Sequence, residues 1–256
     1  MSAWLETPPG RYMLEWEQQQ LDQAVVDLFG FHALQLGLSR LEALRTNRMP
    51  HRWCAGDGQG LDAPPAEGEA PVRALALHCD FDALPFPSQS LDLVVLPHAL
   101  ELAHDPHQTL REVERVLVPE GRVVILGFNP ASLWGLSQRA GRIRQRFGGR
   151  TPLYLPRTGE FIGYWRLRDW LRLLSFEVER GRFGCYRPGV RTQAWLDRFE
   201  WIESTGERWW PVFGAVYFVV AVKRVRGMRL IGLRRKEALK TKAAPAVVAN
   251  RHRSMK

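Results

Sequence analysis

Several polar residues of this chain directly follow short apolar runs, where a side chain could reach a bound ligand. Asp80 and Phe81 come after the run at 73–78, and His98 comes after the run at 91–96. An aspartate there could accept hydrogen bonds from a ligand, and a histidine could orient a substrate or act as a general base. Each also has a simpler interpretation. Asp80 could be a turn residue, and His98 could pack in the core without proton chemistry.

Histidines gather around this position, since His104 and His107 follow His98 and Glu101 lies between them. Their spacing differs from the compact ligand pairs that are usual for zinc. The Asp-Pro pair at 105–106 is better explained as a helix start, with aspartate as N-cap and proline in the first helical position. We therefore predict no metal ion in this segment.

The elements that must position these residues alternate between strands and helices. Helical periodicity and end signals predict helices at 14–29, from Asp105 to Gly121, from Asn129 to about 150, and at 166–175. Apolar runs predict strands at 31–36, 51–55, 73–78, 91–96, 122–127, 177–186 and 215–225. This alternation predicts an α/β fold with a doubly wound sheet of about seven strands. In such sheets, ligands bind beyond the carboxyl ends of the strands.

Composition argues against several classes of protein. No run of eighteen apolar residues occurs, so we expect no membrane-spanning helix, and the first residues lack a signal-peptide pattern. Cys54, Cys79 and Cys185 are odd in number, widely spaced and never arranged as C-x-x-C. That usage disfavours both a disulfide framework and a zinc site. We expect a reducing compartment and a cytoplasmic location.

The net charge of +9 is concentrated at one end of the chain. Residues 223–256 hold 12 of the 36 Lys and Arg residues and one of the 27 acids, which gives +11. The remainder holds 24 basic and 26 acidic residues, or −2. We therefore predict one domain at 1–225 and a basic, disordered tail at 226–256. The tail could make weak contacts with nucleic acid or an anionic surface, or it could be solvated without a partner.

Four motifs follow one another within residues 80–121. They are DFDALPF at 80–86, LDLVV at 91–95, DP at 105–106 and LREVERVLVPEG at 110–121. Their order and spacing resemble the class I methyltransferases of the type 11 family. The resemblance implies a Rossmann-like sheet, mostly parallel, whose last strand lies inside it and runs antiparallel. It also implies transfer of a methyl group from S-adenosyl-L-methionine to an acceptor that the sequence does not identify.

The resemblance also implies roles for individual residues. Asp80 would accept a hydrogen bond from the adenine amino group, and the backbone N–H of Phe81 would donate to the ring. Asp57 is the best candidate to hold the ribose hydroxyls, although its place between two glycines favours a turn residue. Pro97 and His98 would line the chamber in which the methyl group moves.

The first glycine loop departs from the family pattern, in which an acid precedes Gly-x-Gly-x-Gly. Gly37 alone remains of the glycines, and Gln35 stands where the acid would face the methionine ammonium group. Glutamine accepts that hydrogen bond without charge assistance, so we expect weaker cofactor binding. Arg40 could instead pair with the methionine carboxylate. The alternative function is therefore a non-catalytic binding protein that kept the methyltransferase fold.

An arginine-rich insert at 131–150 lies in a stretch without acidic residues. Its apolar residues share one helical face, which we expect to pack on the domain while the arginines face outward or toward an acceptor. Such a helix could be a lid, a clamp for an anionic substrate or a membrane-surface contact, or merely a surface helix with solvated arginines. The apolar residues are Leu133, Leu136, Ala140, Ile143 and Phe147, and the arginines are Arg139, Arg142, Arg144, Arg146 and Arg150.

Overall fold

A computed structural model describes most of the predicted domain. The described residues are 2–56, 76–147, 154–155, 161–190 and 192–225. Asp57, Arg150 and the predicted basic tail at 226–256 lie outside them.

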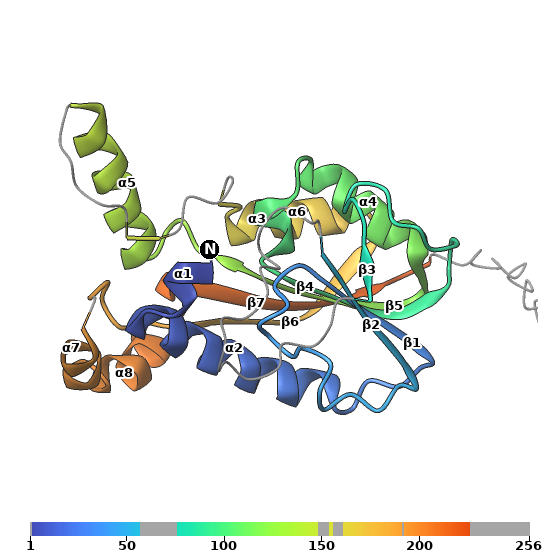
Figure 1. The fold of residues 1–256 in the computed structure, drawn as a ribbon, viewed down its shortest axis with the longest axis horizontal. Coiled ribbons are helices and arrows are strands. Elements are labelled where there is room, and N and C mark those ends of the chain that lie inside the picture. Colours follow the sequence, from blue (N-terminus) through green and yellow to red (C-terminus); the bar gives the residue numbers. More distant parts are fainter. Residues whose placement is uncertain (1, 57–75, 148–153, 156–160, 191, 226–256) are drawn as a thin grey trace, which may run out of the picture. The chain divides into compact units, whose positions relative to one another are not determined.

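Within the described residues, seven strands form one sheet in the order β3-β2-β1-β4-β5-β7-β6 (Figure 1). The pairs that join β1, β2, β3, β4 and β5 are parallel, whereas β7 runs antiparallel to both β5 and β6. This confirms the predicted fold class, including a buried last strand inside the sheet. The strands are β1 His32–Leu36, β2 His51–Gly56, β3 Leu77–His78, β4 Leu91–Pro97, β5 Leu117–Phe128, β6 Phe176–Gly184 and β7 Val216–Lys223.

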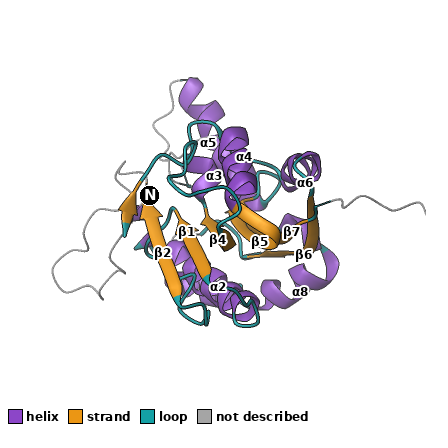
Figure 2. Ribbon diagram, turned by 90° about the vertical axis from the view of Figure 1, so that its right-hand side faces the viewer, coloured by secondary structure: helices purple, strands orange, loops and turns teal. Residues whose placement is uncertain are grey.

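Helices cover both faces of this sheet (Figure 2). One face carries α2, and the other carries α3, α4 and α6 (Figures 1 and 2). The helices are α1 Ser2–Leu5, α2 Pro8–Val25, α3 Ala99–Leu102, α4 Pro106–Val116, α5 Leu133–Arg146, α6 Tyr164–Leu173, α7 Gln193–Arg198, α8 Trp201–Trp209 and the 3-10 helix η1 Pro211–Phe213.

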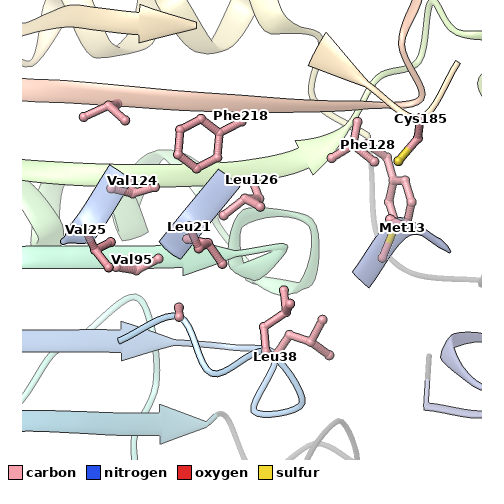
Figure 3. Packing of buried hydrophobic residues seen from close by; sticks show 14 of the residues in the cluster. Met13, Leu21, Val25, Leu38, Val95, Val124, Leu126, Phe128, Cys185 and Phe218 are labelled. Carbon is pink, nitrogen blue, oxygen red and sulfur yellow. The ribbon is translucent and has the colours of Figure 1, made fainter. Parts of the chain in front are cut away.

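The central strands are apolar on both faces, because successive side chains of a strand point to opposite sides. In β4, Leu93 and Val95 belong to the core under α2, and Val94 and Leu96 belong to the core under α4 and α6. Figure 3 shows the first of these cores, where side chains of α2 pack on those of β4, β5 and β7. The connection at 37–50 between β1 and β2 contains no helix. The face of the sheet beside this connection is covered instead by α2, which precedes β1 in the chain.

Several helix boundaries differ from the sequence predictions, three of them for a clear local reason. α2 begins at Pro8 rather than near residue 14, because two prolines fit its first positions. α4 ends at Val116 rather than at Gly121, because Leu117 already pairs with Leu91 of β4 and begins β5. α5 begins after Ser132, not Asn129, and the serine side chain accepts a hydrogen bond from the Gly135 N–H.

The predicted start of α4 is confirmed. The side chain of Asp105 accepts hydrogen bonds from the N–H groups of His107 and Gln108, and Pro106 occupies the first turn. The short helices α3, α7 and α8 were not predicted, because their apolar residues do not recur long enough to show a helical period.

Candidate functional site

The carboxyl ends of β1 and β4 meet at the point where strand order reverses, which is the usual ligand position in such sheets. The N–H of Leu38 donates to the carbonyl of Pro97 at 3.4 Å. Gly37 has a φ of 95°, and a Cβ atom on it would lie 3.0 Å from the Pro97 carbonyl oxygen. A side chain would therefore be both strained and crowded there. The structure brings together three predicted site residues, Gly37, Pro97 and His98.

Gln35 lies at the same edge, but its side chain folds the loop that follows β1. The amide nitrogen donates to the carbonyls of Leu38 at 2.9 Å and Leu41 at 2.7 Å, and the amide oxygen accepts from the Ala43 N–H at 3.1 Å. The residue is 2% exposed. A role toward a methionine ammonium group would require these bonds to open, so that role stays a prediction. Arg40, the other candidate in this loop, pairs with Glu6.

Asp80 lies exposed in the turn after β3. One carboxylate oxygen accepts from the Asp82 N–H at 3.0 Å, and the Asp80 carbonyl accepts from the Ala83 N–H at 3.2 Å. Phe81, by contrast, is buried in the core under α4 and α6. These bonds are those of a turn residue, and the adenine contact of Asp80 and Phe81 stays a prediction.

Two charged residues of α4 hold the segment that follows this turn. Glu112 accepts from the Leu84 N–H at 3.0 Å, and Arg115 donates to the carbonyls of Leu84 and Phe86 at 2.9 Å each. Arg115 also pairs with Glu112 at 2.7 Å. Side chains of the motif at 110–121 therefore fix the backbone of the motif at 80–86.

A buried charged cluster lies beside Gly37 at the end of β4. The Nε2 atom of His98 lies 2.7 Å from Glu17 Oε1 of α2, and Nδ1 lies 2.9 Å from Glu101 Oε2 of α3. Glu101 also accepts from the N–H of Phe128 at the end of β5. Among the described residues, Glu17 Oε2 has no hydrogen-bond partner. The cluster joins α2, α3, β4 and β5 at the carboxyl edge of the sheet.

The two carboxylates keep His98 protonated. Burial alone lowers the pKa of an imidazole, but the charges of Glu17 and Glu101 outweigh burial and raise the pKa of His98 to about 10. Both ring nitrogens are then donors to carboxylates, so neither is free to accept a proton. The geometry thus supports the packed histidine over the general base among our two interpretations. The two neighbouring histidines do not join this cluster. His107 packs on Trp170 with ring centroids 3.7 Å apart, and His104 is exposed.

We expect His98 to show no titration near pH 6.5. Its pKa lies above that of an unfolded histidine, so its stabilising contribution is complete below about pH 6.5 and is lost as pH rises toward about 10. Ring resonances of His98, followed by NMR against pH, measure this directly, with the exposed His104 as internal control. A midpoint for His98 close to that of His104 would contradict the paired cluster.

An apolar groove of about 520 Å³ lies at the same edge of the sheet, beyond β5 and β6. Phe128 and Gly184 both pair with Val216, so β5 and β6 end level with each other and with the start of β7. The wall of the groove comes from the first turns of α5, from Tyr186 just beyond β6, and from α8 and η1. It includes Leu133, Leu136, Tyr186, Trp201, Trp210 and Phe213.

The orientation of α5 is opposite to our prediction. Trp134 and Gln138 are buried, whereas Leu133 and Leu136 are about half exposed and Ile143 is 58% exposed. The reason is that Trp134 packs among aromatic rings and donates from Nε1 to the Arg187 carbonyl at 2.8 Å. A single large aromatic residue thus determined which face of the helix is buried.

Glu17 and Glu101 were not predicted as members of a charged site. Glu101 was considered only as a metal ligand. Glu17 could have been found, because it lies on one helical face with Met13, Leu21 and Val25 at four-residue spacing, and these three are buried core residues. An acid in the middle of an apolar helical face indicates a buried partner of opposite charge.

Comparison with known proteins agrees with this fold. Residues 61–125 match the family model described as "Methyltransferase domain". The solved complex between the Haloferax volcanii Trm112 methyltransferase activator and its methyltransferase contains a chain similar to this one, with a TM-score of 0.56 at 18% identity, covering 88% of this chain and 96% of that one. The chain therefore has the fold of class I methyltransferases, and its residues 61–125 are similar to the methyltransferase domain family.

Two curated relatives are similar in sequence. The uncharacterized protein YafS of Escherichia coli (strain K12) is 32% identical over 177 residues, and this covers 69% of this chain and 65% of that protein. The malonyl-[acyl-carrier protein] O-methyltransferase of Halorhodospira halophila is 44% identical over 61 residues, or 24% of this chain and 21% of that enzyme. The chain therefore spans less than two thirds of the length of either relative.

Proposed function

We propose that this protein is a methyltransferase that uses S-adenosyl-L-methionine to methylate an apolar acceptor bound in the groove. The observation that carries the proposal is the position of this groove at the carboxyl edge of the sheet, the same edge that holds Gly37, Pro97 and His98. Ligands of doubly wound sheets bind at this edge. Because the groove is lined by leucine and aromatic side chains, an apolar acceptor fits it better than a charged one.

Two carboxylates support the proposal, one for each end of the cofactor. Asp80 presents an exposed carboxylate after β3, where the adenine would lie. At the other end the cofactor carries an ammonium group, and Gln35 is occupied by its own loop. Glu17 brings a buried carboxylate whose Oε2 has no partner among the described residues. We assign to Glu17 the negative charge that the family takes from the residue at position 35.

Bound S-adenosyl-L-methionine supplies a methyl group already activated by a sulfonium centre. The chain then has to position the acceptor in line and exclude water, and both tasks need orientation rather than acid–base side chains. A reaction that needs no general base is consistent with the state of His98, because both of its ring nitrogens are bonded to carboxylates. An apolar wall suits the exclusion of water.

Replacement of Asp80 by Asn should weaken the binding of S-adenosylhomocysteine about tenfold, because one hydrogen bond to a charged acceptor contributes about 1–2 kcal/mol. Isothermal titration calorimetry measures this, and Asp169→Asn on α6 is the matched control, since Asp169 is also exposed. Equal affinities of the Asp80 and Asp169 variants for S-adenosylhomocysteine would show that Asp80 does not contact the cofactor.

The alternative is a non-catalytic protein with this fold, and the closed loop of Gln35 favours it. A loop held by three hydrogen bonds from one buried amide leaves no open acceptor for a cofactor at that position. The decisive observation is the binding of S-adenosylhomocysteine to the unmodified protein. Absence of binding at millimolar ligand would establish the non-catalytic alternative.

A further inference from the structure

We propose that the surface formed by α5, α8 and η1 docks this protein on an anionic lipid bilayer. α5 presents an apolar stripe to solvent, whose members recur at spacings of three and four residues and so share one helical face. Phe147 just beyond its end is 85% exposed. Helices on globular proteins normally turn such a stripe inward, and an exposed one marks an interaction surface. The stripe consists of Leu133, Leu136, Ala140, Ile143 and Phe147.

The stripe cannot turn inward, because the domain holds α5 by the opposite face. Trp134 is 1% exposed and donates from Nε1 to the Arg187 carbonyl at 2.8 Å. The side-chain amide of Gln138 bonds both backbone groups of Leu155, donating at 3.2 Å and accepting at 2.9 Å. Rotation of the helix would break these buried bonds. Exposure of the stripe is therefore built into the packing.

Arginines border the stripe, and α5 carries no acidic residue. At 3.6 residues per turn, Arg139 and Arg146 lie along one side of it and Arg144 lies along the other. All three are exposed. Arginine can lay its apolar stem beside acyl chains while its guanidinium group reaches lipid phosphates. An apolar stripe between two rows of cations is the pattern of a helix that lies in the plane of a membrane surface.

α8 and η1 extend the same surface with aromatic residues at the same end of the sheet as α5 (Figure 1). Trp201 and Trp210 line the groove together with Leu133 and Leu136, so the aromatic cluster is continuous with the stripe. Tryptophan is enriched where protein meets the headgroup region of a bilayer, since its ring is apolar and its N–H is polar. The exposed fractions are 62% for Trp201, 69% for Trp209, 56% for Trp210 and 49% for Phe213.

Charge identifies the partner as anionic. A second copy placed stripe to stripe would bring arginines of one α5 against those of the other. The segment at 223–256 has a charge of +11, which adds to attraction toward anionic lipid. The groove opens on this surface, so an apolar acceptor could enter it from the bilayer, and this last step rests on the proposed function.

Vesicle co-sedimentation of the full chain tests the proposal. We expect binding to vesicles of phosphatidylglycerol and phosphatidylcholine in equal parts, and little binding to phosphatidylcholine alone. The variant Arg139→Gln, Arg144→Gln, Arg146→Gln should bind about 100-fold more weakly, because all three arginines border the stripe and would lie nearest to an anionic surface. The variant Ile143→Ser, Phe147→Ser should lose binding while its urea unfolding stays unchanged, because both residues are exposed.

The matched control removes the same charge elsewhere, with Arg111→Gln, Arg168→Gln and Arg172→Gln on α4 and α6, where all three are exposed. It should bind vesicles like the unmodified protein, and an equal loss would show charge attraction without a docking surface. Self-association that the Ile143 and Phe147 variant abolishes would identify a dimer interface instead. Binding to single-stranded RNA without binding to vesicles would identify a nucleic-acid surface. Each of these three results overturns the proposal, and none depends on cofactor binding.

Discussion

Replacement of His98 by Leu should lower the free energy of unfolding by about 3–5 kcal/mol at neutral pH. The imidazolium is the shared partner of Glu17 and Glu101, and the exposures of the three side chains are 0%, 0% and 1%. Without it, two carboxylates would face each other in a site that water does not reach. Removing one partner of a buried ion pair is costly because the remaining charge is neither solvated nor paired.

Urea denaturation measures this loss, and two further variants identify its cause. The additional replacement of Glu17 by Leu should restore part of the stability, because Glu101 keeps the Phe128 N–H as a partner. The stability of the His98 variant should also rise as pH falls, because protonation removes the unpaired charges. His104→Leu is the control, since His104 is exposed. If His98→Leu and His104→Leu unfold at the same urea concentration, the buried charged cluster does not exist in solution.

The sheet was predictable from the sequence because its signals are local and redundant. Strands such as β4 and β7 are apolar on both faces, and α4 carries an N-cap, a proline and an apolar face that agree with one another. The antiparallel last strand came from the family resemblance, since nothing in its composition reveals its direction. β3 was predicted at 73–78, and the described part is Leu77–His78.

The candidate site was less predictable, because its properties depend on contacts between distant segments. His98 meets Glu17, which is 81 positions away, and that contact decides its protonation. The orientation of α5 depends on Trp134, rather than Leu133, packing against the rings of Trp4 and Tyr154. Neither fact follows from helical periodicity. Periodicity indicates that a helix has an apolar face, but it does not indicate that a larger residue on another face will be buried in its place.

Replacement of Gln35 by Glu should destabilise the protein and leave cofactor binding no tighter, although it supplies the acid that the family resemblance implies at this position. The Gln35 amide nitrogen donates to the carbonyls of Leu38 and Leu41. A carboxylate has no hydrogen to donate, and an oxygen in its place would face two carbonyl oxygens in a buried loop. Leaving two buried acceptors unpaired costs about 2–4 kcal/mol.

The competing expectation from the resemblance is that a glutamate at position 35 would face the methionine ammonium group and tighten binding by charge assistance. Urea denaturation and calorimetry with S-adenosylhomocysteine, carried out on the same preparation, decide between the two. Gln35→Met is the matched variant, because it removes the same hydrogen bonds without adding charge and should be the milder change. A Gln35→Glu protein that binds tighter at unchanged stability would show that the loop opens in solution and that position 35 serves the cofactor. A less stable protein with unchanged affinity would show that Gln35 stabilises the loop and does not contact the cofactor. The negative charge near the cofactor would then have to come from another residue, and Glu17 would be the next residue to replace.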